Sequence, residues 1–272
     1  MNYQAMLIGA QVSVSIAILI YASWRDYKCR EVSNRVWAIY LPIATALSTV
    51  DLLLFDSSKL LLFGISVGFT VGLAFLLFYS GGFGGADSKA LMCIAVALPF
   101  APVAIFTPII SGSLSPIAQY IFPLTIFGNG VLFAAASIFY IFVRNVVWHK
   151  RNGKKMFMGT LATESVGKKI LVLITGYKVT IDKLKEKWHI FPMEDVSEIE
   201  ELTVKRKLVV VPNEDGRNKM VERLSDAVKA GKIDSYIWAT PGLPMLIFIT
   251  AGLLVALLFG DVVWLLVKLV IS

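Results

Sequence analysis

Long apolar runs, separated by short polar stretches, constrain this chain more than any other feature. A bilayer core takes roughly 20 apolar residues per helix, and six runs approach that length. They cover residues 4–23, 36–55, 60–80, 88–110, 124–143 and 243–267. The residues are 57% hydrophobic and 17% charged, which is more apolar than a soluble domain of this length requires. The sequence therefore predicts a mostly α-helical membrane protein with six transmembrane helices.

Two of these runs also fit a second interpretation. The fourth is interrupted by prolines, which break helices, so it is compatible with a shorter helix followed by an outer loop; these are Pro99, Pro102 and Pro108. The last run carries Asp261 and Lys268 near its end. Residues 262–272 alternatively form an interfacial tail.

Charged residues divide the chain into an apolar and a polar part. Residues 144–237 hold nineteen Lys and Arg and thirteen Asp and Glu, whereas residues 1–23 hold no charged side chain. The pattern predicts two strands in 170–181 around Thr175 and Gly176, a third in 202–212, and a helix in 216–232. We therefore expect a small α+β domain inserted before the last span. Its basic excess fits a solvated surface or contact with anionic lipid headgroups.

These patterns predict three regions. Residues 1–143 form a membrane domain with spans one to five, 144–237 a soluble α+β domain, and 238–272 the sixth span with a C-terminal tail. Lys and Arg gather in 24–35, at Lys89 and in 144–237, and such residues favour the cytoplasmic side of a membrane. The sequence thus predicts a multi-pass protein of the cell membrane with these segments in the cytoplasm and both termini outside.

Six acidic residues accompany the apolar runs, and two of them have an unusual position. Asp51, Asp56 and Asp261 fall near predicted outer ends, where hydrated boundary residues are expected. Asp26 and Asp87 instead lie at the cytoplasmic mouths of two spans, on the same predicted side. An ionisable residue at such a place is a functional candidate. Taken singly, Asp26 also fits a loop salt bridge, and Asp87 fits a helix N-cap.

Two carboxyl groups at one membrane depth suggest a shared-proton pair. Close carboxylates do not both ionise easily, so one acts as an acid and the other as a base near neutral pH. The base takes a proton from water, which attacks a peptide carbonyl, and the acid protonates the carbonyl oxygen and then the leaving amine. The glycines of SGGFGGADSK, residues 80–89, allow close backbone approach beside Asp87, or simply form a turn between spans.

The stretches DYKCREVSN (26–34) and GGFGGADSKAL (81–91), with the surrounding spans, resemble the archaeal preflagellin and prepilin peptidases. These belong to the GxGD class of intramembrane aspartyl proteases, which includes bacterial type IV prepilin peptidases and, more remotely, presenilin. The closing WATPGLPMLIF (238–248) and the soluble insert before the last span add to the resemblance. The extra cytoplasmic cysteine motif of the bacterial members is absent from the sequence, which favours the archaeal branch.

The resemblance implies the roles of particular residues. Asp26 and Asp87 match the two catalytic aspartates, and Lys89 matches a lysine that often follows the second. Gly84 and Gly85 belong to the Gly-rich motif. Ala86 departs from it, because the GxGD pattern has glycine immediately before the aspartate. An alanine there is poorly suited to a positive φ.

The family's activity would then be the removal of short basic leader peptides from preflagellins and type IV prepilin-like precursors at the cytoplasmic face. Glu31 is a candidate contact for the basic leader. No metal or organic cofactor is implied, because water is the nucleophile, and no nucleic-acid partner is expected. Two other functions remain open: a proton-coupled transporter, and a membrane scaffold whose basic domain binds a partner or lipid. A transporter is expected to place its acids nearer the bilayer midplane, and a scaffold needs neither aspartate.

Overall fold

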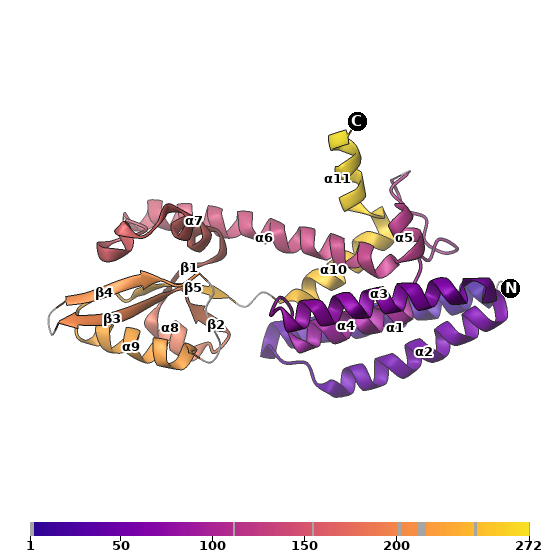
Figure 1. Ribbon diagram of the computed structural model, residues 1–272, viewed down its shortest axis with the longest axis horizontal. Helices are drawn as coiled ribbons and strands as arrows, with labels where there is room; N and C mark the ends of the chain where they lie inside the picture. Colours follow the sequence, from indigo (N-terminus) through magenta and orange to yellow (C-terminus); the bar gives the residue numbers. More distant parts are fainter. Residues whose placement is uncertain are drawn as a thin grey trace. The chain divides into compact units, whose positions relative to one another are not determined.

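The computed structural model describes residues 3–110, 112–153, 155–200, 203–210, 216–241 and 244–271. The chain divides into two compact units, Met1–Ala134 with Pro244–Ser272, and Ala135–Leu243. We call the first the membrane unit and the second the polar unit (Figure 1). Long apolar helices dominate the first and small β-sheets occur in the second, which confirms the predicted fold class.

Four helices of the described chain are long and apolar enough to cross a membrane. They are α1 (Tyr3–Cys29), α2 (Asn34–Phe55), α3 (Leu60–Tyr79) with the preceding 3₁₀ turn η1 (Ser57–Lys59), and α6 (Phe122–Asn152). Helices α10 (Met245–Phe259) and α11 (Val262–Ile271) are bent by 65° and add a fifth span if they count as one. The expected count of six is thus not reached in the described residues.

The fourth predicted span is instead a short helix, α4 (Gly85–Ala97). At about 1.5 Å per residue it is too short to cross a bilayer core of about 30 Å. The helix stops before Pro99, and residues 98–115 contain no regular helix or strand among those described. The short helix α5 (Pro116–Tyr120) follows. Of the two interpretations of this run, the structure therefore confirms the short helix followed by a loop.

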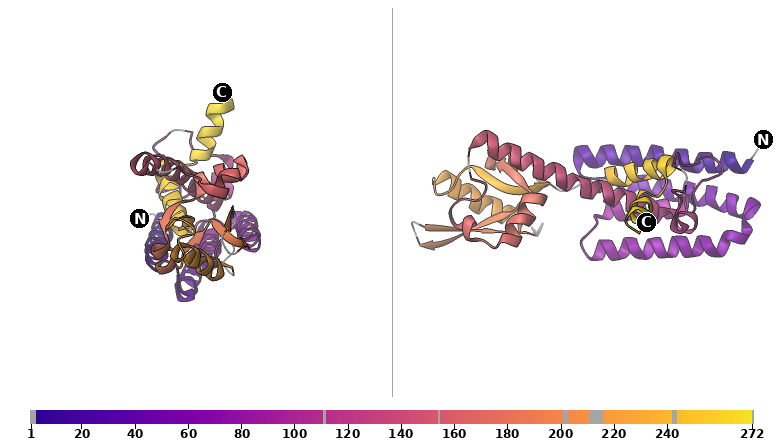
Figure 2. Two further views of the ribbon diagram at one scale, coloured as in Figure 1. Left: turned by 90° about the vertical axis from the view of Figure 1, so that its left-hand side faces the viewer. Right: turned by 90° about the horizontal axis from the view of Figure 1, so that it is seen from above.

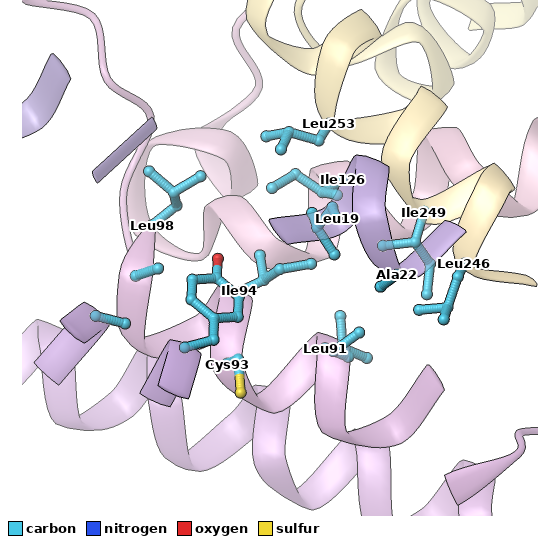
Figure 3. Close-up of a cluster of buried hydrophobic side chains, with 14 of the residues drawn as sticks. Leu19, Ala22, Leu91, Cys93, Ile94, Leu98, Ile126, Leu246, Ile249 and Leu253 are labelled. Atoms are coloured by element: carbon cyan, nitrogen blue, oxygen red, sulfur yellow. The ribbon is translucent and has the colours of Figure 1, made fainter. Parts of the chain in front are cut away.

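Helix α4 lies at the centre of the membrane unit, where it packs against α1, α2, α3 and α10. Its buried side chains face all directions, as expected for a helix enclosed by other helices. Figure 3 shows Leu91 and Ile94 of α4 close to Leu19 of α1 and Ile249 of α10, all of them with 0% exposure. The N-terminus of α4, which carries Asp87, is thereby fixed by four neighbouring helices.

Helices α6 and α10 cross with their backbones in contact at two glycines. A Cβ atom on Gly252 would overlap the carbonyl oxygen of Ile126 and would lie 2.7 Å from the backbone nitrogen of Gly130. A Cβ atom on Gly130 would lie 2.9 Å from the carbonyl oxygen of Phe248. Small residues at such crossings allow helices in membranes to approach closely. This crossing fixes α10 within the membrane unit.

The polar unit contains two small antiparallel sheets. Strands β1 (Tyr177–Thr180), β5 (Tyr236–Pro241) and β2 (Ile190–Pro192) form one in the order β1-β5-β2, and β3 (Glu194–Glu200) pairs with β4 (Thr203–Leu208). Helix α9 (Arg217–Lys229) packs against β2 and β3, with α8 (Ile181–Glu186) beside it (Figure 1 and Figure 2). Leu224 and Ala227 of α9 are buried in the hydrophobic core of the polar unit.

The structure confirms three of the predicted elements, among them β1 as the second strand expected in 170–181, and corrects one. The helix expected in 216–232 is α9, with Gly231 at a φ of 67° just beyond its end. The strand expected in 202–212 is β4, although residues 202, 211 and 212 lie outside the described chain. The first of two strands expected in 170–181 is wrong, because Val166–Thr175 forms helix α7. Ser165 caps α7 by accepting from the N–H of Lys168, a local signal that outweighed the β-prone run.

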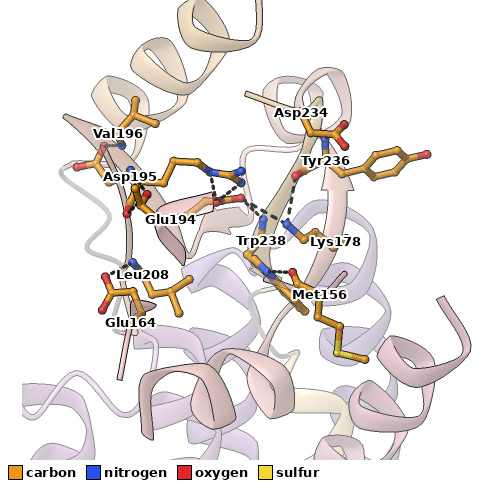
Figure 4. Close-up of polar contacts among 12 residues, drawn as sticks. Met156, Glu164, Lys178, Glu194, Asp195, Val196, Leu208, Asp234, Tyr236 and Trp238 are labelled. Atoms are coloured by element: carbon orange, nitrogen blue, oxygen red, sulfur yellow. Dashed lines mark hydrogen bonds and ion pairs between the residues drawn. The ribbon is translucent and has the colours of Figure 1, made fainter. Parts of the chain in front are cut away.

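A buried carboxylate organises the polar unit. Glu194 is fully buried and binds the guanidinium of Arg206, and it accepts from the backbone N–H of Trp238 at 2.6 Å. The ammonium of Lys178 lies 3.9 Å from the same carboxylate (Figure 4). A buried charge persists only with such partners. The cluster joins β3, β4, β1 and β5 into one unit.

Candidate active site

Asp26 lies in the last turn of α1, half-buried, where α10 begins. The backbone N–H of Leu246, in the first turn of α10, acts on its carboxylate. One turn earlier, Ser23 Oγ lies 2.7 Å from the hydroxyl of Thr250 and donates to the carbonyl oxygen of Leu246 at 2.9 Å. The unpaired N–H groups of a helix N-terminus favour a negative charge. The start of α10 therefore orients Asp26.

The first residues of the glycine-rich turn before α4 form the C-terminal cap of α3. The N–H of Gly82 donates to the carbonyl of Leu77 at 2.9 Å, and the N–H of Gly81 donates to that of Phe78 at 3.1 Å. This pair of bonds is the Schellman motif, which requires a left-handed residue after the helix. Gly81 has a φ of 76° and fills that position. The turn is thus set by its backbone hydrogen bonds.

Phe83 anchors the same turn to the core of the membrane unit. Its side chain is 8% exposed and meets Phe127 of α6 edge to face, with ring centroids 5.6 Å apart. The next residue, Gly84, is the N-cap of α4, and its N–H donates to Asp87 Oδ2 at 3.1 Å. Asp87 is therefore the third residue of the helix, and the N-cap role considered from the sequence belongs to Gly84.

The two aspartates belong to one electrostatic neighbourhood. The charge of Asp26 acts on the carboxylate of Asp87, and the charge of Arg30 acts on both. A backbone N–H at the start of a helix also acts on each carboxylate: Asp87 accepts a hydrogen bond from that of Gly84, and that of Leu246 acts on Asp26. Chemically, such a pair suits the sharing of one proton between two carboxyl groups.

The other residues singled out from the sequence surround this pair. Ala86 is the second residue of α4, and the only non-glycine residue of the described chain with positive φ is Arg30, so the departure from the glycine pattern needs no unusual backbone. Lys89 of α4 donates to the side chain of Asn34, at the start of α2, at 2.7 Å. Glu31 is exposed in the link between α1 and α2.

Gly84 offers a test of how closely the turn fits the Asp87 carboxylate. A Cβ atom on Gly84 would lie 3.2 Å from Asp87 Oδ2, whereas a Cβ atom on Gly85 would meet only Phe78, at 3.7 Å. We expect Gly84→Ala to displace the carboxylate and to lower the rate of peptide cleavage about tenfold. Gly85→Ala is the matched control and should stay within about twofold. Equal rates for the two variants, measured at matched protein levels, would show that the Asp87 position tolerates the displacement.

Sequence reasoning missed three participants and misjudged one acidic residue. Arg30, Asn34 and the N–H of Leu246 gave no separate signal, because their roles depend on helices that meet only in the fold. Asp261 was expected to be hydrated but is 6% exposed. Its carboxylate accepts hydrogen bonds from Ser115 at 2.5 Å and from the N–H of Trp264 at 3.0 Å, and the second bond caps α11.

Among the described residues no group of three or more His, Cys, Asp or Glu side chains is arranged to hold a metal ion.

Comparison with known proteins shows which protein families this chain is similar to. Residues 13–139 match the type IV leader peptidase family, and residues 168–262 match the archaeal peptidase A24 C-terminus type II. The chain is 28% identical to the preflagellin peptidase of Methanococcus voltae, over 92% of this chain and 94% of that protein. It is 26% identical to the preflagellin peptidase of Methanococcus maripaludis, over 89% and 92%. The chain therefore resembles leader peptidases along most of its length and is a protease.

Proposed function

We propose that this protein is a membrane aspartyl endopeptidase that removes the short basic leader peptide from preflagellins and type IV prepilin-like precursors. The chemistry is assigned to Asp26 and Asp87, and cleavage takes place at the cytoplasmic face of the cell membrane. The observation that carries the proposal is that the charge of Asp26, in the last turn of α1, acts on the carboxyl group of Asp87, in the first turn of α4. The match to a leader peptidase family supports the reaction class.

In the proposed mechanism the carboxyl pair holds one proton. The ionised carboxylate takes a proton from a water molecule, whose oxygen forms a bond to the carbonyl carbon of the scissile peptide. The protonated carboxyl group gives its proton to the carbonyl oxygen, which yields a neutral tetrahedral intermediate. The carboxyl group that gained a proton from water then gives it to the nitrogen as the C–N bond breaks, and the other carboxylate takes a proton from a hydroxyl group of the intermediate, so the pair again holds one proton. Because the two groups titrate as a unit, neither aspartate is assigned permanently as the acid.

The substrate class rests on the relatives and on charge. The related proteins of Methanococcus are preflagellin peptidases. A leader with Lys or Arg near the cut is attracted to the carboxyl pair, and Glu31 is a further candidate contact at the link after α1. Basic residues in 24–35 and 144–237 favour a cytoplasmic location for this link. The active site then faces the compartment in which precursors are made.

The function is tested by incubating membranes that carry the wild-type chain with an archaeal preflagellin precursor and, separately, with a prepilin-like precursor. We expect release of the leader from both, detected as a mass shift at its junction with the hydrophobic segment. Cysteines introduced at position 28 or 205 should react only with reagents that reach the cytoplasm. If neither precursor is cleaved, the proposed function is refuted. If a cysteine at position 28 or 205 is labelled from the outer face, the proposed topology is refuted.

The candidate contact at Glu31 has its own test. We expect Glu31→Gln to raise the KM for a basic leader by about 2–5-fold, the range of an exposed ion pair. The same change should have no effect on a precursor whose leader lysines are replaced by glutamine. Glu222→Gln on the exposed face of α9 is the matched control. An equal effect of Glu31→Gln on both precursors would argue against contact between Glu31 and leader charge.

A further inference from the structure

Arg30 occupies a backbone position that normally calls for glycine. Helix α1 ends at Cys29, and Arg30 follows it with a φ of 54°, the only positive φ of a non-glycine residue in the described chain. The N–H of Arg30 donates to the carbonyl oxygen of Asp26 at 2.9 Å, which closes the helix with a left-handed cap. A side chain in this conformation is strained because Cβ crowds the following carbonyl group. Arginine is therefore an unfavourable choice for the cap alone.

The side chain of Arg30 is placed where a cation matters for the aspartates. It is half-buried, and its Nε atom is enclosed without a hydrogen-bond partner among the described residues. Its positive charge acts on the carboxylates of both Asp26 and Asp87. A half-buried guanidinium whose charge acts on two carboxylates stabilises a negative charge on them. The strained cap and the enclosed Nε atom thus share one explanation.

Two of the other cations near the site, Lys28 and Lys89, have contacts of their own. The ammonium of Lys28 on α1 lies 4.8 Å from the centre of the Trp24 ring, and Lys89 on α4 donates to Asn34. At the start of α2, Arg35 is exposed, and on α1 Arg25 is half-buried. Helix α10, which packs against Asp26, contains no charged residue. The charged groups that act on Asp87 are accordingly Asp26 and Arg30.

We propose that Arg30 is a positioning residue whose left-handed cap holds its guanidinium beside Asp26 and Asp87, so that the pair carries one negative charge and one proton. This inference rests on the proposed function, because it assigns Arg30 a role in the same two-aspartate reaction. It predicts that catalysis depends on the charge that the cap presents, so that a residue that keeps the cap but has no charge does not replace Arg30.

Two substitutions separate the charge from the backbone. Arg30→Gly relieves the strain at positive φ and removes the charge, whereas Arg30→Lys keeps both the strain and the charge. The measurement is kcat for one preflagellin precursor as a function of pH, with each purified variant in proteoliposomes. Loss of the cation makes protons harder to remove from the pair, so both limbs of the pH profile should move to higher pH.

We expect Arg30→Gly to melt at the same or a higher temperature than the wild type. Its kcat at neutral pH should fall about tenfold, and its pH profile should shift upward by roughly one unit. Arg30→Lys should keep the wild-type profile and remain within about threefold of its rate. If Arg30→Gly does not insert into the membrane, Arg30→Asn replaces it, because asparagine also tolerates positive φ.

The inference is overturned if the charge-free variant keeps the wild-type pH profile, whatever its rate, or if Arg30→Lys shifts as far as Arg30→Gly. Asp26→Asn and Asp87→Asn in the same assay distinguish this failure from failure of the proposed function. Suppose that the wild type cleaves, both Asn variants are inactive, and the pH profile of Arg30→Gly equals that of the wild type. Only the role of Arg30 is then refuted. Cleavage by either Asn variant removes the two-aspartate mechanism.

Discussion

Asp26→Asn and Asp87→Asn should each leave the precursor uncut, with cleavage at least about 10³-fold slower than in the wild type. Asparagine has nearly the shape of aspartate but cannot exchange the proton. Its carbonyl oxygen still accepts a hydrogen bond, so the bond from the N–H of Gly84 to residue 87 should persist. The variants should therefore insert and fold normally, and the effect should lie in the chemical step.

Asp56→Asn is the matched control for these two variants. Asp56 caps the end of α2 and binds Lys59 at 2.8 Å and Gln4 at 3.1 Å, away from the carboxyl pair. It should cleave at the wild-type rate. The double variant of Asp26 and Asp87 should be no slower than either single variant, because the pair acts as a unit. Robust cleavage by one single variant would show that the two carboxyl groups do not act together.

Gly252→Ala should cause a large loss of stability although it adds only one methyl group. That methyl group would overlap the carbonyl oxygen of Ile126 and lie 2.7 Å from the nitrogen of Gly130, both of them backbone atoms of α6. The helices must then separate, at a cost of about 1–3 kcal/mol or more. Because Ser23, one turn before Asp26, is hydrogen-bonded to Leu246 and Thr250 of α10, cleavage should fall as well.

Thermal melting of the purified variants in one detergent checks this expectation. Gly68→Ala is the matched control on α3, since a Cβ atom there meets nothing within 4 Å. Alanine also favours the helix by up to about 1 kcal/mol over glycine. We therefore expect a lower melting temperature for Gly252→Ala and an equal or higher one for Gly68→Ala. Equal melting of Gly252→Ala and the wild type would contradict the close crossing of α6 and α10.

Local patterns in the sequence were sufficient for much of the fold and for the candidate aspartates. The apolar runs predicted the long helices, and the prolines after Leu98 offered the shorter α4 as an alternative. Asp26 and Asp87 were identifiable because a carboxylate at the end of an apolar run is energetically costly and therefore a functional candidate. The β-prone run before Gly176 was misleading, since short apolar segments do not distinguish helix from strand by periodicity alone.

The features that remained hidden depend on contacts between distant segments. Asp261 is buried because Ser115, 146 positions away, binds it, and no local pattern indicates that pairing. The crossing of Gly130 and Gly252 depends on the packing of α6 against α10. Arg30 in a left-handed cap runs against local preference, so its conformation was visible only in the structure.

In the proposed reaction, Asp26 and Asp87 activate water to hydrolyse the leader peptide bond directly. The most direct measurement is mass spectrometry of the released leader after cleavage of a preflagellin precursor in ¹⁸O-labelled water by the purified wild type in proteoliposomes. We predict one ¹⁸O atom in the new leader carboxylate with the wild type, and no leader with Asp26→Asn or Asp87→Asn. Labelled leader released at the wild-type rate by either Asn variant, or no leader from the wild type, would contradict this mechanism.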